Sequence, residues 1–149
     1  MRQFVLWILV LFLAGCATPS GPRFVKDDYV PPGKAVIYIY RLTHIPLQCA
    51  ELYVGARPIG CLSANEYIRV EVEEPGEIPI FDPGYFDLGF TVQDCNIARK
   101  TRGNEYCRVL DTKAGGIYYV RWDGYQHHVN PTTGLAEIRG TFLSGNFYF

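Results

Sequence analysis

Short segments rich in β-branched and aromatic residues recur along this chain, and turn-forming residues lie between them. Residues 35–42 read AVIYIYRL and residues 117–122 read IYYVRW. Such residues favour strands, whereas the Gly and Pro residues that separate the segments favour turns. No segment repeats its apolar residues convincingly at the period of a helix. The pattern therefore predicts an all-β fold, a single antiparallel β-sandwich of seven to eight short strands.

The individual segments differ in the environment that their patterns predict. Residues 35–42 are apolar on both faces, which is typical of a central strand covered on both sides. Apolar and polar residues alternate in residues 66–74, which indicates a strand with one solvated face. Pro79 places residues 77–81 at a sheet edge or a strand end. Further candidate strands lie at residues 50–54, 58–62, 85–95, 105–111, 117–122 and 135–142.

The first fifteen residues differ in character from the rest of the chain. An uncharged run from Phe4 to Ala14 follows Arg2. The run is too short to span a bilayer, which takes about 20 apolar residues, and it fits the apolar part of a secretory signal peptide. The motif LAGC that follows, at residues 13–16, resembles the lipobox of bacterial lipoproteins. This resemblance implies cleavage before Cys16, diacylation of its thiol, and an acyl chain such as palmitate on the new amino terminus.

The lipobox divides the chain into three expected parts. Residues 1–15 are the cleaved signal peptide, residues 16–33 a lipidated N-terminus and tether rich in Pro and Gly, and residues 34–149 the β-sandwich domain. Ala17 stands where lipoproteins of the inner membrane commonly carry Asp. The resemblance therefore implies an anchor in the cell outer membrane that faces the periplasm. The alternative is an ordinary secretory signal followed by a free cysteine.

The cysteines of the expected mature chain are regularly spaced. Besides Cys16 there are four, and Cys49 and Cys61 are separated by twelve positions, as are Cys95 and Cys107. An even number of cysteines in an exported chain indicates disulfides. Three connectivities are possible, and we favour the two local pairs, each closing a hairpin.

The first of these pairs requires an irregular hairpin. A two-residue turn at Gly55-Ala56 would place Cys49 and Cys61 on opposite faces of the strands, because a shift of one residue reverses every side chain. A longer loop or a bulge would bring them to the same face. The alternative is a metal site that uses the thiols with His127 or His128, although neither pair has the close spacing of common zinc sites.

Four segments carry a wider resemblance that covers roughly residues 33–125. They are GKAVIYIYR, ELYVGARPIGCL, EYIRVEVEEPGEIPI and AGGIYYVRW. These segments resemble a family of small bacterial lipoproteins with an uncharacterised domain and, more distantly, the PEGA-type β-sandwich domains of cell-envelope proteins. The resemblance implies a fold and a compartment. It brings no catalytic residues, and the cysteine pairs are not part of the pattern.

The chain offers little for catalysis. Its serines lie outside any G-x-S-x-G motif, and its paired carboxylates occur in contexts typical of solvated acids. The formal net charge of −1 gives no reason to expect a nucleic-acid partner. We therefore expect a non-enzymatic protein without cofactor or metal.

One aromatic and histidine-containing stretch is the main candidate for contact with a partner. Residues 122–131 read WDGYQHHVNP, in which Trp122, Tyr125, His127 and His128 could contact a glycan or a protein. The alternative is a connecting loop in which Trp122 closes the core. An exposed aromatic patch would support the contact, whereas buried rings would contradict it.

A second polar stretch, ARKTRGN at residues 98–104, contains three basic residues. We expect it at a soluble hairpin tip between Cys95 and Cys107, and contact with anionic lipid headgroups is the alternative.

The sequence as a whole predicts a lipid-anchored cell-envelope protein that acts as a binding or structural module. Its expected partners are the membrane, through the lipid on Cys16, and an envelope protein or glycan. Two other classes stay open: an enzyme that processes glycan or peptidoglycan, and an accessory subunit of a secretion or assembly system that pairs through a strand edge.

Overall fold

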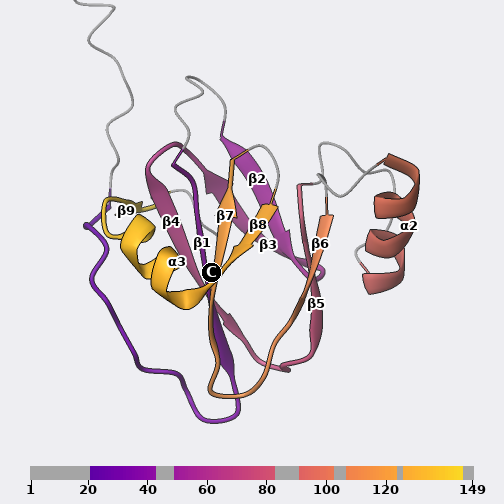
Figure 1. Cartoon of the computed structure of the whole chain (residues 1–149), viewed down its shortest axis with the longest axis horizontal. Coiled ribbons are helices and arrows are strands. Elements are labelled where there is room, and N and C mark those ends of the chain that lie inside the picture. The colour runs from indigo at the N-terminus through magenta and orange to yellow at the C-terminus, as the bar shows by residue number, and fades with distance from the viewer. Residues whose placement is uncertain (1–20, 43–48, 83–90, 103–106, 124–125, 146–149) are drawn as a thin grey trace, which may run out of the picture.

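Two β-sheets face each other in the computed structural model, which describes residues 21–42, 49–82, 91–102, 107–123 and 126–145 (Figure 1). Sheet A consists of β1 (Ala35–Tyr40), β4 (Glu66–Val72), β7 (Ile117–Trp122), β8 (Gln126–Val129) and β9 (Phe142–Leu143). Sheet B consists of β2 (Ala50–Val54), β3 (Arg57–Leu62), β5 (Glu77–Phe81) and β6 (Cys107–Asp111). The spatial orders are β8-β7-β1-β4-β9 and β3-β2-β5-β6. The predicted all-β sandwich is confirmed.

The pairing in sheet A is mixed rather than antiparallel throughout. The strand pairs of sheet B are antiparallel, as are β1–β4 and β7–β8. The pairs β1–β7 and β4–β9 are parallel. After β6 the chain returns to sheet A at the end where β1 begins, and the Val36 N–H donates to the Gly116 carbonyl at 2.9 Å. Because both strands start from this end, they run in the same direction.

Helix α2 (Val92–Arg102) occupies part of the segment that was expected to be a strand at residues 85–95. Thr91 and Asp94 explain where it begins. The Thr91 hydroxyl accepts from the Asp94 N–H at 3.1 Å, and the Asp94 carboxylate accepts from the Thr91 N–H at 3.2 Å. This reciprocal pair satisfies two amide groups that a helix start leaves without partners. The prediction of a strand is wrong for residues 92–95, and residues 85–90 lie outside the described part.

Helix α3 (Pro131–Ile138) corrects the strand predicted at residues 135–142. The Asn130 side chain accepts from the Thr133 N–H at 3.0 Å, and Pro131 occupies the first turn, where its missing N–H costs nothing. Only the end of the predicted segment is a strand, as β9. The expectation of a domain without helices is therefore wrong, because α2 precedes β6 and α3 follows β8.

Strand β1 is buried on both faces, as its sequence predicts. Ala35, Ile37 and Ile39 face sheet B in the core between the sheets. Val36, Tyr38 and Tyr40 face outward into a second apolar cluster. This outer cluster also contains side chains from other strands, α3 and the N-terminal segment: Phe24, Tyr67, Tyr119 and Ile138.

The segment at residues 21–33, which we call the strap, covers the outer face of sheet A (Figure 1). Phe24 is buried and packs edge-on against Tyr38 and Tyr67, with ring centroids 5.5 and 5.3 Å apart. The Phe24 N–H donates to the Thr141 carbonyl at 2.9 Å, and Arg69 donates to the Tyr29 carbonyl at 3.1 Å. The described part of the predicted tether therefore belongs to the folded domain.

The Cys49–Cys61 disulfide is present, and the predicted irregularity accompanies it. Leu52 pairs with Gly60 whereas the next residue of β2 pairs with Pro58, so Ile59 forms a bulge in β3. The bulge compensates for the two-residue turn and puts both cysteines on one face, with Cα atoms 5.4 Å apart.

The Cys95–Cys107 disulfide is also present, but it does not close a hairpin. Cys95 lies on α2 and Cys107 begins β6, so the bond joins a helix to a strand. Both residues are buried and form a small cluster with Phe81. Because Arg99 and Lys100 lie on this helix, the predicted hairpin tip at residues 98–104 is wrong for its described part.

Candidate functional site

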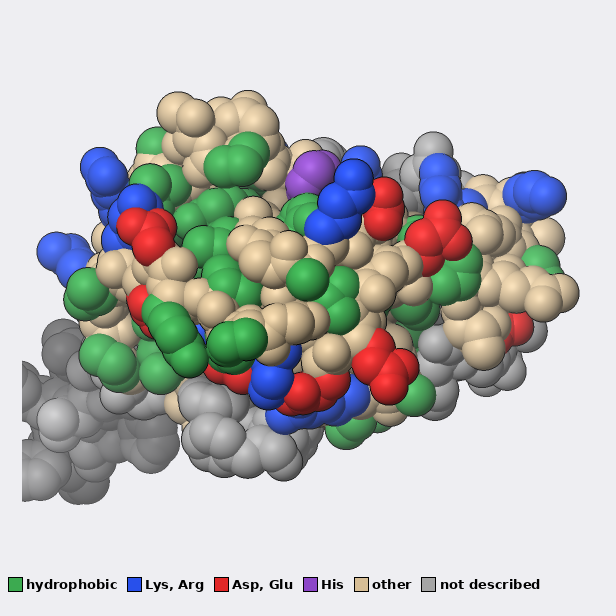
Figure 2. Space-filling view, turned by 90° about the horizontal axis from the view of Figure 1, so that it is seen from below, with side chains coloured by type: hydrophobic (Ala, Val, Ile, Leu, Met, Phe, Trp, Pro, Cys, Tyr) green, Lys and Arg blue, Asp and Glu red, His purple; other side chains and the backbone are tan. Residues whose placement is uncertain are grey.

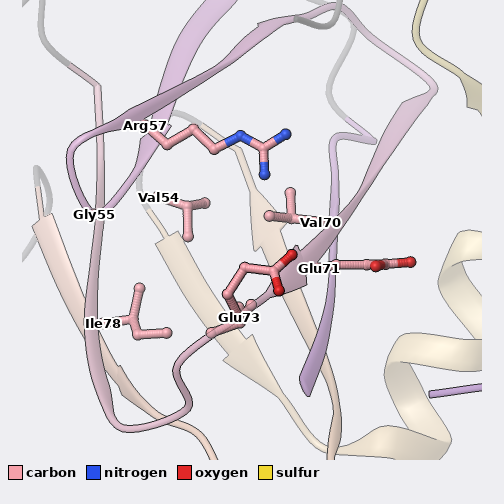
Figure 3. Close-up of a pocket in the computed structure, with 8 residues that line it drawn as sticks. Val54, Gly55, Arg57, Val70, Glu71, Glu73 and Ile78 are labelled. Atoms are coloured by element: carbon pink, nitrogen blue, oxygen red, sulfur yellow. The ribbon is translucent and has the colours of Figure 1, made fainter. Parts of the chain in front are cut away.

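An apolar cavity of about 220 Å³ lies between the two sheets where β4 ends (Figure 3). Four core side chains from three strands form its walls: Val54, Val70, Val72 and Ile78. Each of them is 9% exposed or less, so the cavity reaches the hydrophobic core. Its size is below the roughly 300–1,000 Å³ of drug-sized ligand sites, and it suits one apolar side chain or short alkyl group.

The turn between β2 and β3 forms one side of the cavity. Gly55 adopts a φ of 59°, a left-handed conformation that glycine accepts without strain. Its N–H donates to the Pro79 carbonyl at 2.8 Å, which fixes the turn to β5. β5 lies between β2 and β6 and Pro79 is its middle residue, so the prediction that Pro79 marks a sheet edge or a strand end is wrong. The proline is tolerated because β2 pairs only with Ile80 and Phe81 beyond it.

The mouth of the cavity carries charged side chains of both signs. Arg57 lies on the β3 side, and Glu71 and Glu73 lie on the β4 side. In Figure 3, Arg57 and Glu73 extend toward the same opening from opposite sides, whereas Glu71 points away from the cavity. The mouth is therefore polar although the walls are apolar.

Glu73 at the mouth and Glu71 beside it form ion pairs with Lys34 and Arg69. Lys34 pairs with Glu73 at 2.7 Å and with Glu71 at 3.3 Å, and Arg69 pairs with Glu71 at 2.6 Å. The hydrogen bond from Arg69, and then that from Lys34, hold the pKa of Glu71 below its ordinary value. The hydrogen bond to Glu73 raises the pKa of Lys34. Both groups thus stay charged at neutral pH.

Arg57 differs from these side chains. It makes no ion pair or hydrogen bond with the part of the chain that the structure describes, and it is exposed. A guanidinium group offers five N–H donors, so Arg57 can bind a carboxylate without giving up a bond to the protein.

The cavity and the start of the strap lie at opposite ends of β4, and the strap runs along the sheet to Gly33, next to Lys34 at the cavity end. Glu66, the first residue of β4, pairs with Phe142, which in turn bridges to Arg23 of the strap. The cavity begins at Val70 and extends past the last residue of the strand, Val72. A strand of this length spans roughly 20 Å. Viewed from below (Figure 2), the molecule shows acidic and basic side chains interspersed rather than a region of one sign.

Of the predicted aromatic contact patch, the structure describes the side chains of Trp122 and His128. Trp122 is 3% exposed and packs in the core between the sheets, so its ring is not part of an exposed patch. His128 is exposed, and its ring centroid lies 6.5 Å from that of Tyr118. Partial desolvation of its ring, and then the charge of Arg108, lower the pKa of His128. Tyr125 and the His127 side chain lie outside the described residues, as does Cys16.

The alternative of a metal site on thiols is excluded for the four cysteines other than Cys16, because all four form disulfides. Within the described ranges, no three His, Cys, Asp or Glu side chains come together as a metal ion would require. None of the helices in this part of the chain is long and apolar enough to cross a membrane.

Sequence reasoning missed Arg57 as a site residue and placed Glu73 among solvated acids. Neither stands in a recognisable motif. They become neighbours only because the β2–β3 turn of one sheet lies across from the end of β4 in the other. The spacing of Cys49 and Cys61 around Gly55-Ala56 predicts an irregular hairpin, and the structure has a bulge there. This spacing is the sequence signal that lies near the site.

Comparison with known proteins gives one partial likeness. No protein-family model matches the chain, and no solved structure matches it significantly. Platelet-derived growth factor receptor beta of Canis lupus familiaris is 29% identical over 150 residues, which cover 91% of this chain and 12% of the receptor. The chain thus spans a small share of the relative that it matches, and the likeness assigns no family to it.

Proposed function

We propose that this chain is a lipid-anchored protein of the cell envelope that acts as a binding module. The observation that carries the proposal is the apolar cavity with its charged mouth, which lies at the end of β4 away from the start of the strap at residues 21–23. A concave apolar site with a few polar groups at its opening is typical of ligand recognition.

The lipobox supports a location at the membrane. The short chain length between Cys16 and the folded domain supports one orientation of the domain relative to the membrane. Five Cα steps separate Cys16 from Gly21, and they reach at most about 18 Å. Acyl chains on Cys16 therefore hold the end of the domain where the strap begins close to the membrane, and the cavity lies at the other end of β4. Ala17 favours the outer membrane, with the domain facing the periplasm.

The other candidate functions gain no support from the described residues. Trp122 is buried, so the proposed stacking on a sugar ring loses its main aromatic group. The outer strand β3 contains Pro58 and a bulge, both of which hinder pairing with a further strand. We therefore place binding at the cavity ahead of contact through residues 122–131 and of strand-edge assembly.

The location is tested in cells. Inhibition of the lipoprotein signal peptidase with globomycin should accumulate the uncleaved precursor. Cys16→Ser should release the protein from the membrane fraction, because several acyl chains make a lasting anchor and the substitution removes their attachment point. Normal fractionation of the Cys16→Ser protein would contradict the anchor.

Binding is tested with a neutral apolar probe, 3-methylbutan-1-ol, on the full-length chain in detergent. We expect the probe to shift the amide NMR signals of Val70 and Val72. Val72→Phe fills the cavity and should abolish the shifts, whereas Val25→Phe adds the same volume on the exposed strap and should preserve them. Shifts that persist unchanged in Val72→Phe would contradict the binding site.

A further inference from the structure

The mouth of the cavity presents opposite charges on opposite sides of one apolar opening. Arg57 extends from the β3 side and Glu73 from the β4 side (Figure 3). The ion pairs formed among the described residues do not include one between these two side chains. The two charges therefore face the opening without neutralising each other by direct contact.

Each of the two charged groups retains capacity for a ligand. Lys34 binds Glu73 through one carboxylate oxygen, Oε1, at 2.7 Å. The second oxygen, Oε2, has no hydrogen bond from a described residue, and a carboxylate can accept several. Arg57 donates to none of the described side chains or backbone carbonyls through its guanidinium group. Glu71 differs, since Arg69 and Lys34 already bind both of its oxygens.

We propose that the cavity binds an apolar α-amino acid, with the side chain among the valines, the α-carboxylate on Arg57 and the α-ammonium on Glu73. This inference rests on the proposed binding function and specifies its ligand. The cavity of about 220 Å³ accommodates a branched aliphatic side chain such as that of leucine. An α-amino acid carries an ammonium group and a carboxylate group on the same carbon. It can therefore present a positive group to Glu73 and a negative group to Arg57 at one opening.

The arrangement also predicts selectivity. A ligand with a carboxylate but no amine leaves Glu73 without its partner, and a ligand with an amine but no carboxylate leaves Arg57 without one. Each charged hydrogen bond contributes about tenfold or more to an equilibrium constant. Leucine should therefore bind about tenfold more tightly than either ligand with a single charge.

The test uses three ligands with the same branched alkyl group: leucine, 4-methylpentanoate and 3-methylbutan-1-amine. Their dissociation constants are measured by NMR titration of the full-length chain in detergent. We expect Arg57→Gln to weaken leucine and 4-methylpentanoate about tenfold and to leave the amine unchanged. Glu73→Gln should weaken leucine and the amine and leave 4-methylpentanoate unchanged. Arg23→Gln, at the other end of the molecule, is the matched control and should change none.

The outcomes separate this inference from the function on which it rests. If leucine binds no more tightly than the two ligands with one charge, or if the two substitutions affect all three ligands equally, the amino-acid assignment is overturned and the cavity stands as a site for apolar groups. If neither these ligands nor 3-methylbutan-1-ol bind, the proposed function fails and the inference fails with it. Arg57 and Glu73 are exposed, so both variants should retain the fold.

Discussion

The outer faces of the two sheets are covered in different ways. On sheet A, the strap and α3 lie over an aromatic cluster that contains Phe24, Tyr38 and Tyr119, without a covalent link. On sheet B, α2 buries little more than Cys95 and Ala98, and the bond to Cys107 attaches it to β6. Sheet A is thus covered by apolar packing, whereas the helix on sheet B depends on a disulfide.

This difference shows what each covering segment needs from its sequence. A large aromatic side chain removes enough apolar surface from water to hold an irregular segment in place. Helix α2 has eleven residues and buries chiefly two small ones, which removes too little apolar surface from water to hold the helix in place. Isolated helices of this length are marginally stable in water. The Cys95–Cys107 disulfide therefore holds α2 on sheet B, where apolar packing alone would be too weak.

The largest effect is expected from Phe24→Ala. Truncation of a buried phenylalanine costs about 4 kcal/mol, because it removes its apolar contacts and leaves a cavity against Tyr38 and Tyr67. Chemical denaturation measures the loss, and hydrogen exchange should show that the strap opens. Val25→Ala is the control, since Val25 is 78% exposed and should change stability by less than about 0.5 kcal/mol. Equal effects of the two substitutions would contradict this account of sheet A.

The paired substitution Cys95→Ala/Cys107→Ala should have the next largest effect, about 3 kcal/mol on the loop-entropy model. Cys49→Ala/Cys61→Ala is the matched control because both disulfides have a sequence separation of 12. The unfolded chain therefore gains similar freedom in both variants. Hydrogen exchange separates them: α2 should lose protection only in the first. Continued protection of α2 would show that its packing suffices.

Much of the sandwich could be predicted from the sequence because strands leave a direct pattern. The residues of β1 are apolar on both faces and lie between two clusters. The alternation in β4 separates a core face from a second face, but that face is not solvated throughout, because the strap buries Tyr67 there. The equal cysteine spacings predicted both disulfides. The spacings could not predict which elements each disulfide connects. Two cysteines twelve positions apart can lie on the two strands of a hairpin or on a helix and the strand that follows it.

The helices were missed because their buried stripes are too short to produce a periodic pattern. Their capping residues were present in the sequence: Thr91 and Asp94 form the pattern of a capping box, and Asn130 precedes Pro131. The strand pattern of residues 85–95 includes Thr91 and Asp94, and Asn130-Pro131 indicates a turn as readily as a helix start. The binding site could not be predicted because Arg57 and Glu73 are brought together by the packing of two sheets, which no local pattern encodes.

A smaller effect is expected from Gly134→Ala, which tests how closely α3 packs on sheet A. A Cβ at this position would lie 2.4 Å from the Tyr119 Cβ. Alanine gains about 1 kcal/mol over glycine in a helix, but overpacking costs about 1–3 kcal/mol, so we expect a net loss near 1 kcal/mol. Gly140→Ala is the control, because a Cβ there meets no atom within 4 Å. A thermal unfolding curve with an unchanged or raised midpoint for Gly134→Ala would show that α3 shifts to accommodate the methyl group.

The smallest effect concerns the charged residues beside the strap, and it depends on pH. The folded-state pKa of Glu71 lies below its ordinary value, chiefly because Arg69 donates a hydrogen bond to it. Glu71 therefore contributes fully to the free energy of unfolding above the ordinary glutamate pKa. This contribution is lost as the pH falls through the folded-state pKa. Acid should therefore loosen the hold of Arg69 on the strap carbonyl of Tyr29. We expect the stability of the wild-type protein to fall between about pH 5 and pH 3, and the fall to be smaller in Glu71→Gln. Glu51→Gln, at an exposed position on sheet B, should keep the wild-type slope. Equal slopes in all three proteins would show that this ion pair does not help to hold the strap on sheet A.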